Sequence, residues 1–254
     1  MCIRDRLSEA ALTAVSMAFP IQSLMIAFGT GTAVGINAYL SRNLGERNFA
    51  QADAAAINGI FLAFLSYIAF AVFGLFGSRF FFASQIQDEV IVRYGTDYLT
   101  ICTMVSIGLF MQMTLERILQ STGKTIYTMI TQGTGAIINI IFDPIMIFGL
   151  FGFPRMEVAG AAAATVLGQC VAAVMALIFN LKKNDELHFR FRKFRPSGYI
   201  IRQIYKVGIP SIIMQAVVSL MTLLMNGILL MFSSTAVSVF GVYFKLQSFV
   251  FRCV

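Results

Sequence analysis

The residues best suited to chemistry in this sequence are Asn139 and Asp143, which lie just before a proline in a long apolar stretch. A spacing of four residues puts the amide and the carboxylate on one face of a helix. Pro144 has no backbone N–H, so the carbonyl of Ile140 loses its usual helical partner. Carboxylate, amide and carbonyl oxygens suit a hard cation, and a carboxylate also takes up a proton. We therefore predict a site for Na+ or H+ at Asp143, with local hydrogen bonding at a proline kink as the alternative.

Two other places put charge inside apolar stretches, where an ionisable group costs at least about 2.5–3.5 kcal/mol to insert. Lys245 lies in the last apolar run, where it could pair with a carboxylate, contact a substrate or extend to the membrane interface. Glu116 and Arg117 are consecutive and lie close to Lys124. For this pair we predict a salt bridge at a gate or a helix interface rather than a central coupling site.

Uncharged polar side chains recur along the same apolar stretches. Gln22 and Gln112 are our further candidates for substrate contact or coupling. The other polar residues are expected to make interhelical hydrogen bonds, each contributing about 0.6 kcal/mol. The 14 methionines and 25 phenylalanines suit a cavity that accepts varied lipophilic ligands, and lipid-facing packing explains them equally well.

The cysteines and the histidine form no metal or redox pattern. Cys102 and Cys170 lie inside apolar runs and are read as packing residues. With His188 as the single histidine, we predict no cofactor, no enzyme activity and no metal beyond a coupling Na+. The run Gly123-Lys124-Thr125 lacks the earlier glycine of a phosphate-binding loop, because Ile118 stands in that place. Nucleotide binding is rejected.

These residues must be positioned by helices that cross a lipid bilayer. The chain is 58% hydrophobic and 12% charged, against about 45–50% and about 25% in soluble domains. In lipid only helices and closed barrels satisfy the backbone, and the alternating pattern of barrel strands is absent. We predict an all-α polytopic membrane protein whose seven spans, the last cut short, are 11–41, 54–77, 94–121, 127–151, 158–181, 207–232 and 236–254.

Positive charge in the connectors predicts the orientation and the domain division. Residues 182–206 are rich in Lys and Arg, which places this loop in the cytoplasm. We read it as the linker between an N-terminal lobe, residues 1–181, and the first two helices of a C-terminal lobe, residues 207–254. Aromatic and basic residues alternate in the linker, and anchoring at an anionic leaflet is favoured over RNA contact.

Two segments of the chain resemble each other. Residues 14–25 align with 239–250, pairing Phe19 with Phe244 and Gln22 with Gln247. The later copy follows a complete helix that the earlier copy lacks. This predicts two parallel repeats of six helices, related by an axis along the membrane normal. We expect one further helix before residue 7 and about four after residue 254.

The runs 116–125, 139–144 and 158–162 resemble the MATE (multidrug and toxic compound extrusion) transporters, particularly their bacterial drug-exporting branch. Residues 14–35 and 244–248 fit the same pattern. The resemblance implies two six-helix lobes in a V shape and antiport that exchanges Na+ or H+ for lipophilic or cationic drugs. It also implies a multi-pass protein of the inner (cytoplasmic) membrane, which we expect to be a monomer in the bilayer without a nucleic-acid partner.

Site residues follow from the resemblance position by position. The family's N-lobe cation site uses an Asn and an Asp one turn apart on the fifth helix, matching Asn139 and Asp143. It also uses a Thr on the sixth helix, for which Thr165 is the candidate. An Asp on the family's first helix has no counterpart, so we do not expect this chain alone to complete a transport cycle. The alternatives are a lipid-linked oligosaccharide flippase of related fold, whose cavity should hold several cationic groups, and a truncated product without transport.

Overall fold

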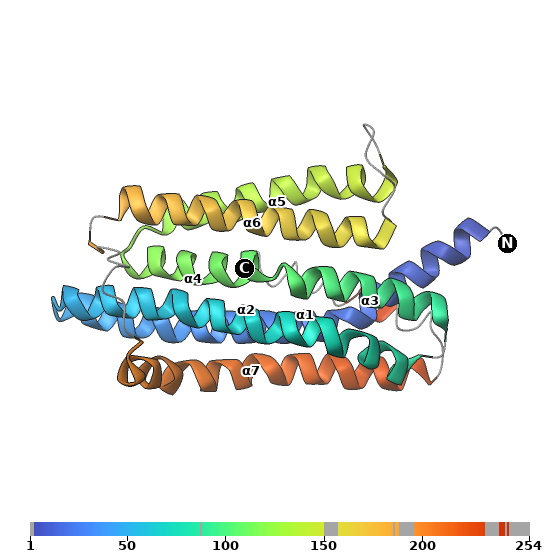
Figure 1. Ribbon diagram of the computed structural model, residues 1–254, viewed down its shortest axis with the longest axis horizontal. Helices are drawn as coiled ribbons and strands as arrows, with labels where there is room; N and C mark the ends of the chain where they lie inside the picture. Colours follow the sequence, from blue (N-terminus) through green and yellow to red (C-terminus); the bar gives the residue numbers. More distant parts are fainter. Residues whose placement is uncertain are drawn as a thin grey trace.

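The helices of the computed structural model run side by side along one direction, with α4, α1 and α2 in the middle of the bundle (Figure 1). The structure describes residues 3–86, 88–149, 157–184, 186–187, 196–231, 239–241 and 243, and no strand occurs among them. In chain order the helices are α1 (Ile3–Gly45), α2 (Phe49–Gln85), α3 (Glu89–Met104), α4 (Ile107–Ser121), α5 (Thr125–Phe148), α6 (Glu157–Lys183) and α7 (Gly198–Leu230).

The predicted membrane spans coincide with these helices. Four segments are long and apolar enough to cross a membrane, and α3 with α4 makes a fifth if the bent pair is one span. The four segments are Thr13–Gly45, Phe49–Gln85, Thr125–Ile147 and Val158–Lys183. The span predicted at 207–232 falls within α7 up to its last residues, and the one at 236–254 lies almost entirely outside the described residues. The prediction of an all-helical membrane fold is confirmed.

The third predicted span, 94–121, is divided into α3 and α4, which meet at a bend of 44°. No proline lies at this bend. Instead the Thr103 hydroxyl donates to the carbonyl of Leu99 at 2.7 Å, and the Ser106 hydroxyl donates to the carbonyl of Thr103 at 2.7 Å. Hydroxyls that bond nearby carbonyls compete with the helical ladder and bend it. This local competition, which hydropathy does not register, explains the break.

Close packing of α1 against α7 depends on glycine. A Cβ added at Gly31 would lie 2.9 Å from the backbone nitrogen of Ile212, and one added at Gly35 would overlap the carbonyl of Ile204. Ile204 also belongs to a buried cluster that joins α1, α2, α4 and α7. Small residues that let two backbones approach are the usual means of helix association in lipid, where apolar burial gives no driving force.

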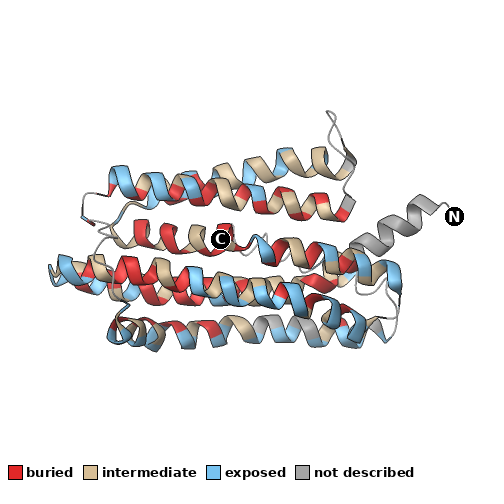
Figure 2. Ribbon diagram, in the orientation of Figure 1, coloured by how far each residue is buried: buried red, intermediate tan, exposed pale blue. Residues whose placement is uncertain are grey.

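The outer surface is apolar, as lipid contact requires. Figure 2 shows buried residues in the middle of the bundle and exposed residues on the outward sides of α5 and α7. Several exposed side chains are large and hydrophobic, among them Phe76, Phe80 and Met214, which are 73–80% exposed. In water a surface of this kind would mark an interaction site, whereas in a bilayer it is the ordinary lipid-facing surface.

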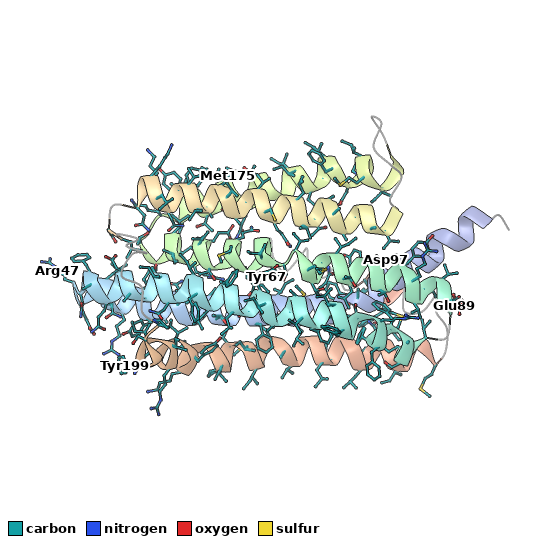
Figure 3. All side chains as sticks on the ribbon, viewed as in Figure 1. Arg47, Tyr67, Glu89, Asp97, Met175 and Tyr199 are labelled. Atoms are coloured by element: carbon teal, nitrogen blue, oxygen red, sulfur yellow. The ribbon has the colours of Figure 1, made fainter. Side chains whose placement is uncertain are left out.

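Charged residues gather at the two ends of the bundle. Figure 3 places Arg47 at one end and Glu89 and Asp97 at the other. The exposed ion pair between Arg42 and Glu46, 3.0 Å apart, lies near Arg47. This separation follows the connector pattern from which the orientation was predicted.

A glycine comparison tests whether the α1–α7 contact stabilises the bundle. Gly35→Ala should lower the free energy of unfolding by about 1–3 kcal/mol, because the added methyl group overlaps the α7 backbone. Gly133→Ala is the matched control, since nothing lies within 4 Å of a Cβ there, and it should raise stability by about 0.5–1 kcal/mol through helix propensity. Thermal unfolding in lipid nanodiscs measures both. Equal effects of the two substitutions would contradict the packing account.

Candidate functional site

The candidate site lies where α5 and α6 run side by side (Figure 1). Their backbones approach closely because a glycine on each helix lies at the contact. A Cβ added at Gly168 on α6 would lie 2.8 Å from the carbonyl oxygen of Gly135 on α5. This separation is too small for any larger residue at position 168. The close approach brings Thr165, one turn before Gly168, next to Asn139 on α5.

The Asn139 amide joins Asp143 to Thr165. In the amide orientation that satisfies its neighbours, the nitrogen donates to Asp143 Oδ2 at 3.1 Å and the oxygen accepts from the Thr165 backbone N–H at 3.2 Å. The Thr165 hydroxyl lies 3.1 Å from the same amide oxygen and 2.9 Å from the Ala161 carbonyl, so it donates to one of the two. The structure thus brings together the three residues that the sequence analysis grouped as a cation site.

The second carboxylate oxygen of Asp143 is left without a partner. Its Oδ1 is buried and makes no hydrogen bond within the described part of the chain. An unsatisfied polar atom in an apolar environment costs about 1–3 kcal/mol, and more when it is charged. Pro144 lies inside α5 one residue further on and donates no hydrogen bond to the Ile140 carbonyl. The local arrangement therefore favours uptake of a proton or a cation at Asp143.

A polar cavity of about 710 Å³ reaches this group of residues. Asn139 and Thr165 are part of its wall, which is built by α1, α4, α5, α6 and one residue of α7. The lining is dominated by amide side chains and includes one acidic and one basic group. Its polar residues are Thr30, Gln112, Glu116, Arg117, Gln120, Gln132, Asn139, Thr165, Gln169 and Gln215.

A smaller cavity of about 180 Å³ meets the larger one at Thr165 and Gln169. Gln22 lies in its wall, where the amide nitrogen is 3.1 Å from the Tyr98 hydroxyl and 3.4 Å from Cys102 Sγ. Gln22 is therefore tied to α3, and its role as a substrate contact stays a prediction. Sequence reasoning missed Tyr98, because it lies among other polar residues, including Tyr94 and Asp97, and no local signal distinguishes it.

Glu116 is only 5% exposed. Its carboxylate accepts hydrogen bonds from neutral side chains. Gln112 Nε2 donates to Oε1 at 3.0 Å. The Thr131 hydroxyl lies 2.9 Å from the same oxygen and 2.8 Å from the Thr128 carbonyl, and its one proton is shared between them. Gln132 Nε2 donates to Oε2 at 2.9 Å. Gln112, a predicted substrate contact, thus lines the cavity with its amide nitrogen turned to Glu116.

The salt bridge predicted for Glu116 and Arg117 does not form between these two residues. Arg117 Nη1 donates instead to Gln120 Oε1 at 2.9 Å. Consecutive residues on a helix point to different faces, so they cannot pair as residues three or four apart do. Both side chains still border the same cavity. Lys245, the remaining charged candidate, lies outside the described residues.

Relatives of known function resemble the chain along nearly all of its length. It is 28% identical over 243 residues to the multidrug export protein MepA of Staphylococcus haemolyticus (strain JCSC1435). It is 24% identical over 243 residues to MepA of Staphylococcus aureus (strain NCTC 8325 / PS 47). Each alignment covers 94% of this chain and 52% of the relative, so the chain spans about half the length of these proteins.

Solved transporter structures share the fold. The inward-facing conformation of a multidrug resistance MATE family transporter of the MOP superfamily matches with a TM-score of 0.88 and 25% identity, over 95% of this chain and 54% of the other. The MATE multidrug transporter DinF-BH, solved in complex with R6G, matches with a TM-score of 0.87 and 28% identity over the same shares. A MOP superfamily transporter from Pyrococcus furiosus, described as having a binding pocket of reverse polarity and a different function, matches with a TM-score of 0.84 and 25% identity, over 96% of this chain and 54% of the other.

The family model for MatE matches residues 1–145, more than half of the chain. This match covers α1 to α4 and most of α5, including Glu116, Asn139 and Asp143. The helical fold, the cavity and the likeness to solved transporters agree with this match. The chain belongs to the MatE family of multidrug transporters.

Proposed function

We propose that the chain works in an antiporter of the inner membrane that takes up Na+ or H+ and exports lipophilic or cationic compounds. The observation that carries the proposal is the Asp143 carboxylate, which has one oxygen hydrogen-bonded to Asn139 and one oxygen buried without a partner in the described chain. Its partner Asn139 lines a large cavity. The export activity of the MepA relatives and the likeness to multidrug transporters support the direction of transport. We propose a monomer as the working unit.

The coupling ion would be held by oxygen atoms of α5 and α6. Rotation of the Asn139 amide would turn its oxygen toward Asp143 without changing the shape of the side chain. The Thr165 hydroxyl and the carbonyl of Ile140 are further oxygen donors of the kind Na+ prefers. A proton would instead neutralise the free Asp143 oxygen directly. Either ion neutralises the negative charge of Asp143, which now accepts the Asn139 hydrogen bond. Ion uptake therefore alters the hydrogen bonds that run from Asp143 through Asn139 to Thr165 and join α5 to α6.

Exchange follows from the electrostatic interaction between the two ligands. A positively charged compound in the cavity is attracted by the ionised Asp143 and loses that attraction once Na+ or H+ binds there. At an effective dielectric constant of about 20, two unit charges 4 Å apart interact by about 4 kcal/mol, and the effect falls with distance. Because coupling between two ligands is reciprocal, the compound also lowers the affinity for the ion.

A flippase for lipid-linked oligosaccharides is the second candidate function, and the charge of the cavity argues against it. A pyrophosphate-bearing substrate should be met by several cationic groups. Among the described lining residues Arg117 is the one basic side chain, and Glu116 lies beside it in the sequence. The remaining polar lining is uncharged. This lining suits a neutral or cationic compound better than an anionic one.

Asp143→Asn tests the coupling carboxylate. In cells that express the chain in its full genetic context, the substitution should abolish cation-driven efflux of a fluorescent lipophilic cation, because the amide neither takes up a proton nor neutralises Na+. Asp97→Asn is the control, since Asp97 is an exposed carboxylate at the end of the bundle, and it should leave efflux unchanged. Normal efflux by Asp143→Asn at wild-type expression would rule out the coupling role.

Thr165 offers a test of the ligand set. Thr165→Val keeps the shape but removes the hydroxyl, and it should weaken ion binding about tenfold, or about 1.4 kcal/mol. Thr165→Ser keeps the hydroxyl and should bind the ion as the wild type does. The measurement is the dependence of thermal unfolding on Na+ and on pH for the chain in lipid nanodiscs. If Val and Ser variants respond alike, Thr165 is not a ligand.

A further inference from the structure

We propose that Glu116 is a positioning residue for the cation site, which fixes α5 against α4 and so determines where Asn139 and Asp143 lie. The inference rests on the proposed function, because the site it positions is the one assigned there. Glu116 itself lies on α4. It contacts α5 at Gln132, which is about two helical turns from Asn139.

The carboxylate of Glu116 is a junction between two helices. Thr131 and Gln132 donate to its two oxygens from α5, while Gln112 donates to it from within α4. The Thr128 hydroxyl on α5 adds a longer hydrogen bond, 3.4 Å, to the Glu116 backbone carbonyl. Four hydrogen bonds therefore meet at one residue, three of them from α5. Bonds to a buried charge are stronger than bonds between neutral groups.

Apart from its long contact with α6, α5 is attached to the rest of the bundle mainly through α4. Figure 1 shows α5 at the edge of the bundle, beside α6 and away from α1 and α2. Its outward side chains Ile126, Met129, Ile137 and Ile140 are 58–73% exposed, so they contact lipid and do not fix the helix. Attachment to α6 and to Glu116 is what remains to define where α5 lies.

The same turn of α4 also holds α6. The Asn180 side chain on α6 donates to the carbonyl of Leu115 at 3.0 Å, and Leu115 directly precedes Glu116. Two consecutive residues of α4 thus anchor the two helices that build the cation site. Thr165 is carried by the helix anchored at Leu115, and Asn139 and Asp143 are carried by the helix anchored at Glu116. The distance between these site residues then depends on both anchors.

The geometry of α5 transmits a change at Glu116 to the site. Gln132 and Asn139 are seven residues apart, which is about two turns and about 10 Å along the helix axis. Residues at this spacing lie on the same face, in agreement with both side chains lining the cavity. A shift of α5 at Gln132 therefore moves Asn139 relative to Thr165.

A positioning role fits the contacts better than direct contact with a cationic substrate. Both carboxylate oxygens already accept hydrogen bonds, whereas Asp143 has one oxygen without a partner. The three side-chain donors to the Glu116 carboxylate are neutral, so the negative charge is stabilised without an added cation. Its loss would leave donors on α5 unsatisfied.

The test exchanges the carboxylate between the two helices. The variants are Glu116→Gln, the double variant Glu116→Gln with Gln132→Glu, and Asp97→Asn as a control that removes an exposed carboxylate on α3. Each chain is studied in lipid nanodiscs by hydrogen–deuterium exchange of the backbone and by titration with NaCl and with acid, followed by thermal unfolding. Asp143→Asn is included because it removes the ion site without touching Glu116.

Glu116→Gln should raise amide exchange in α5 about tenfold, with α1 unchanged, and should weaken the ion response about tenfold. The double variant keeps one carboxylate facing one amide between α4 and α5, so it should restore both values to within about threefold of wild type. Asp97→Asn should resemble wild type. Asp143→Asn should lose the ion response, while the turn of α5 at Thr131 and Gln132 exchanges as in the wild type.

Unchanged α5 exchange in Glu116→Gln would overturn the proposal. A folded double variant that fails to recover would also overturn it, because the carboxylate would then be needed at position 116 itself. If Glu116→Gln does not fold, the double variant decides the question. Wild-type amide exchange in α5 of the double variant supports the positioning role, and an unfolded double variant refutes it. If the wild type responds to neither Na+ nor acid, the proposed function fails, and the exchange data alone decide the role of Glu116.

Discussion

Every polar group inside the bilayer must find its partner within the protein, and this constraint shapes the rest of the structure. The helices satisfy the backbone, and glycines at Gly35 and Gly168 let neighbouring helices approach. The polar side chains that remain then connect one helix to another. Asn180 and Glu116 tie α6 and α5 to the same turn of α4. The cation site is thus held by the hydrogen bonds that lipid makes obligatory.

Asp143 departs from this constraint, and it is the one carboxylate among the described side chains with a buried oxygen that lacks a partner. We propose that this departure lets the site take up an ion. One of its oxygens accepts from Asn139 and the other has no partner in the described chain. Glu116, buried in the same half-bundle, has both oxygens satisfied by neutral donors. We therefore propose different roles for the two carboxylates. In this proposal the satisfied carboxylate gives the helices a fixed arrangement, and the unsatisfied one takes up the cation or proton.

Much of the fold could be predicted from the sequence, because hydropathy and helix geometry are local properties. Apolar runs located the helices, and a spacing of four residues put Asn139 and Asp143 on one face. The break between α3 and α4 could not be predicted in this way, since it depends on hydroxyls bonding nearby carbonyls. The sequence predicted a salt bridge at a gate or helix interface for Glu116 and Arg117, and it could not show that the Glu116 carboxylate is met by neutral side chains of α5 that follow fifteen and sixteen residues later. Thr165 was grouped with the site only through the family resemblance, since its contact with Asn139 spans 26 residues.

The central claim is that a cation at Asp143 and a compound in the cavity exclude each other. Its most direct measurement is the affinity for a fluorescent lipophilic cation, determined in nanodiscs at a series of Na+ concentrations and pH values, for the chain in its full genetic context. The account predicts that the apparent Kd rises as Na+ or H+ is added, and that this dependence disappears in Asp143→Asn. An affinity that is the same at every ion concentration in the wild type, or the same dependence in the variant, would contradict it.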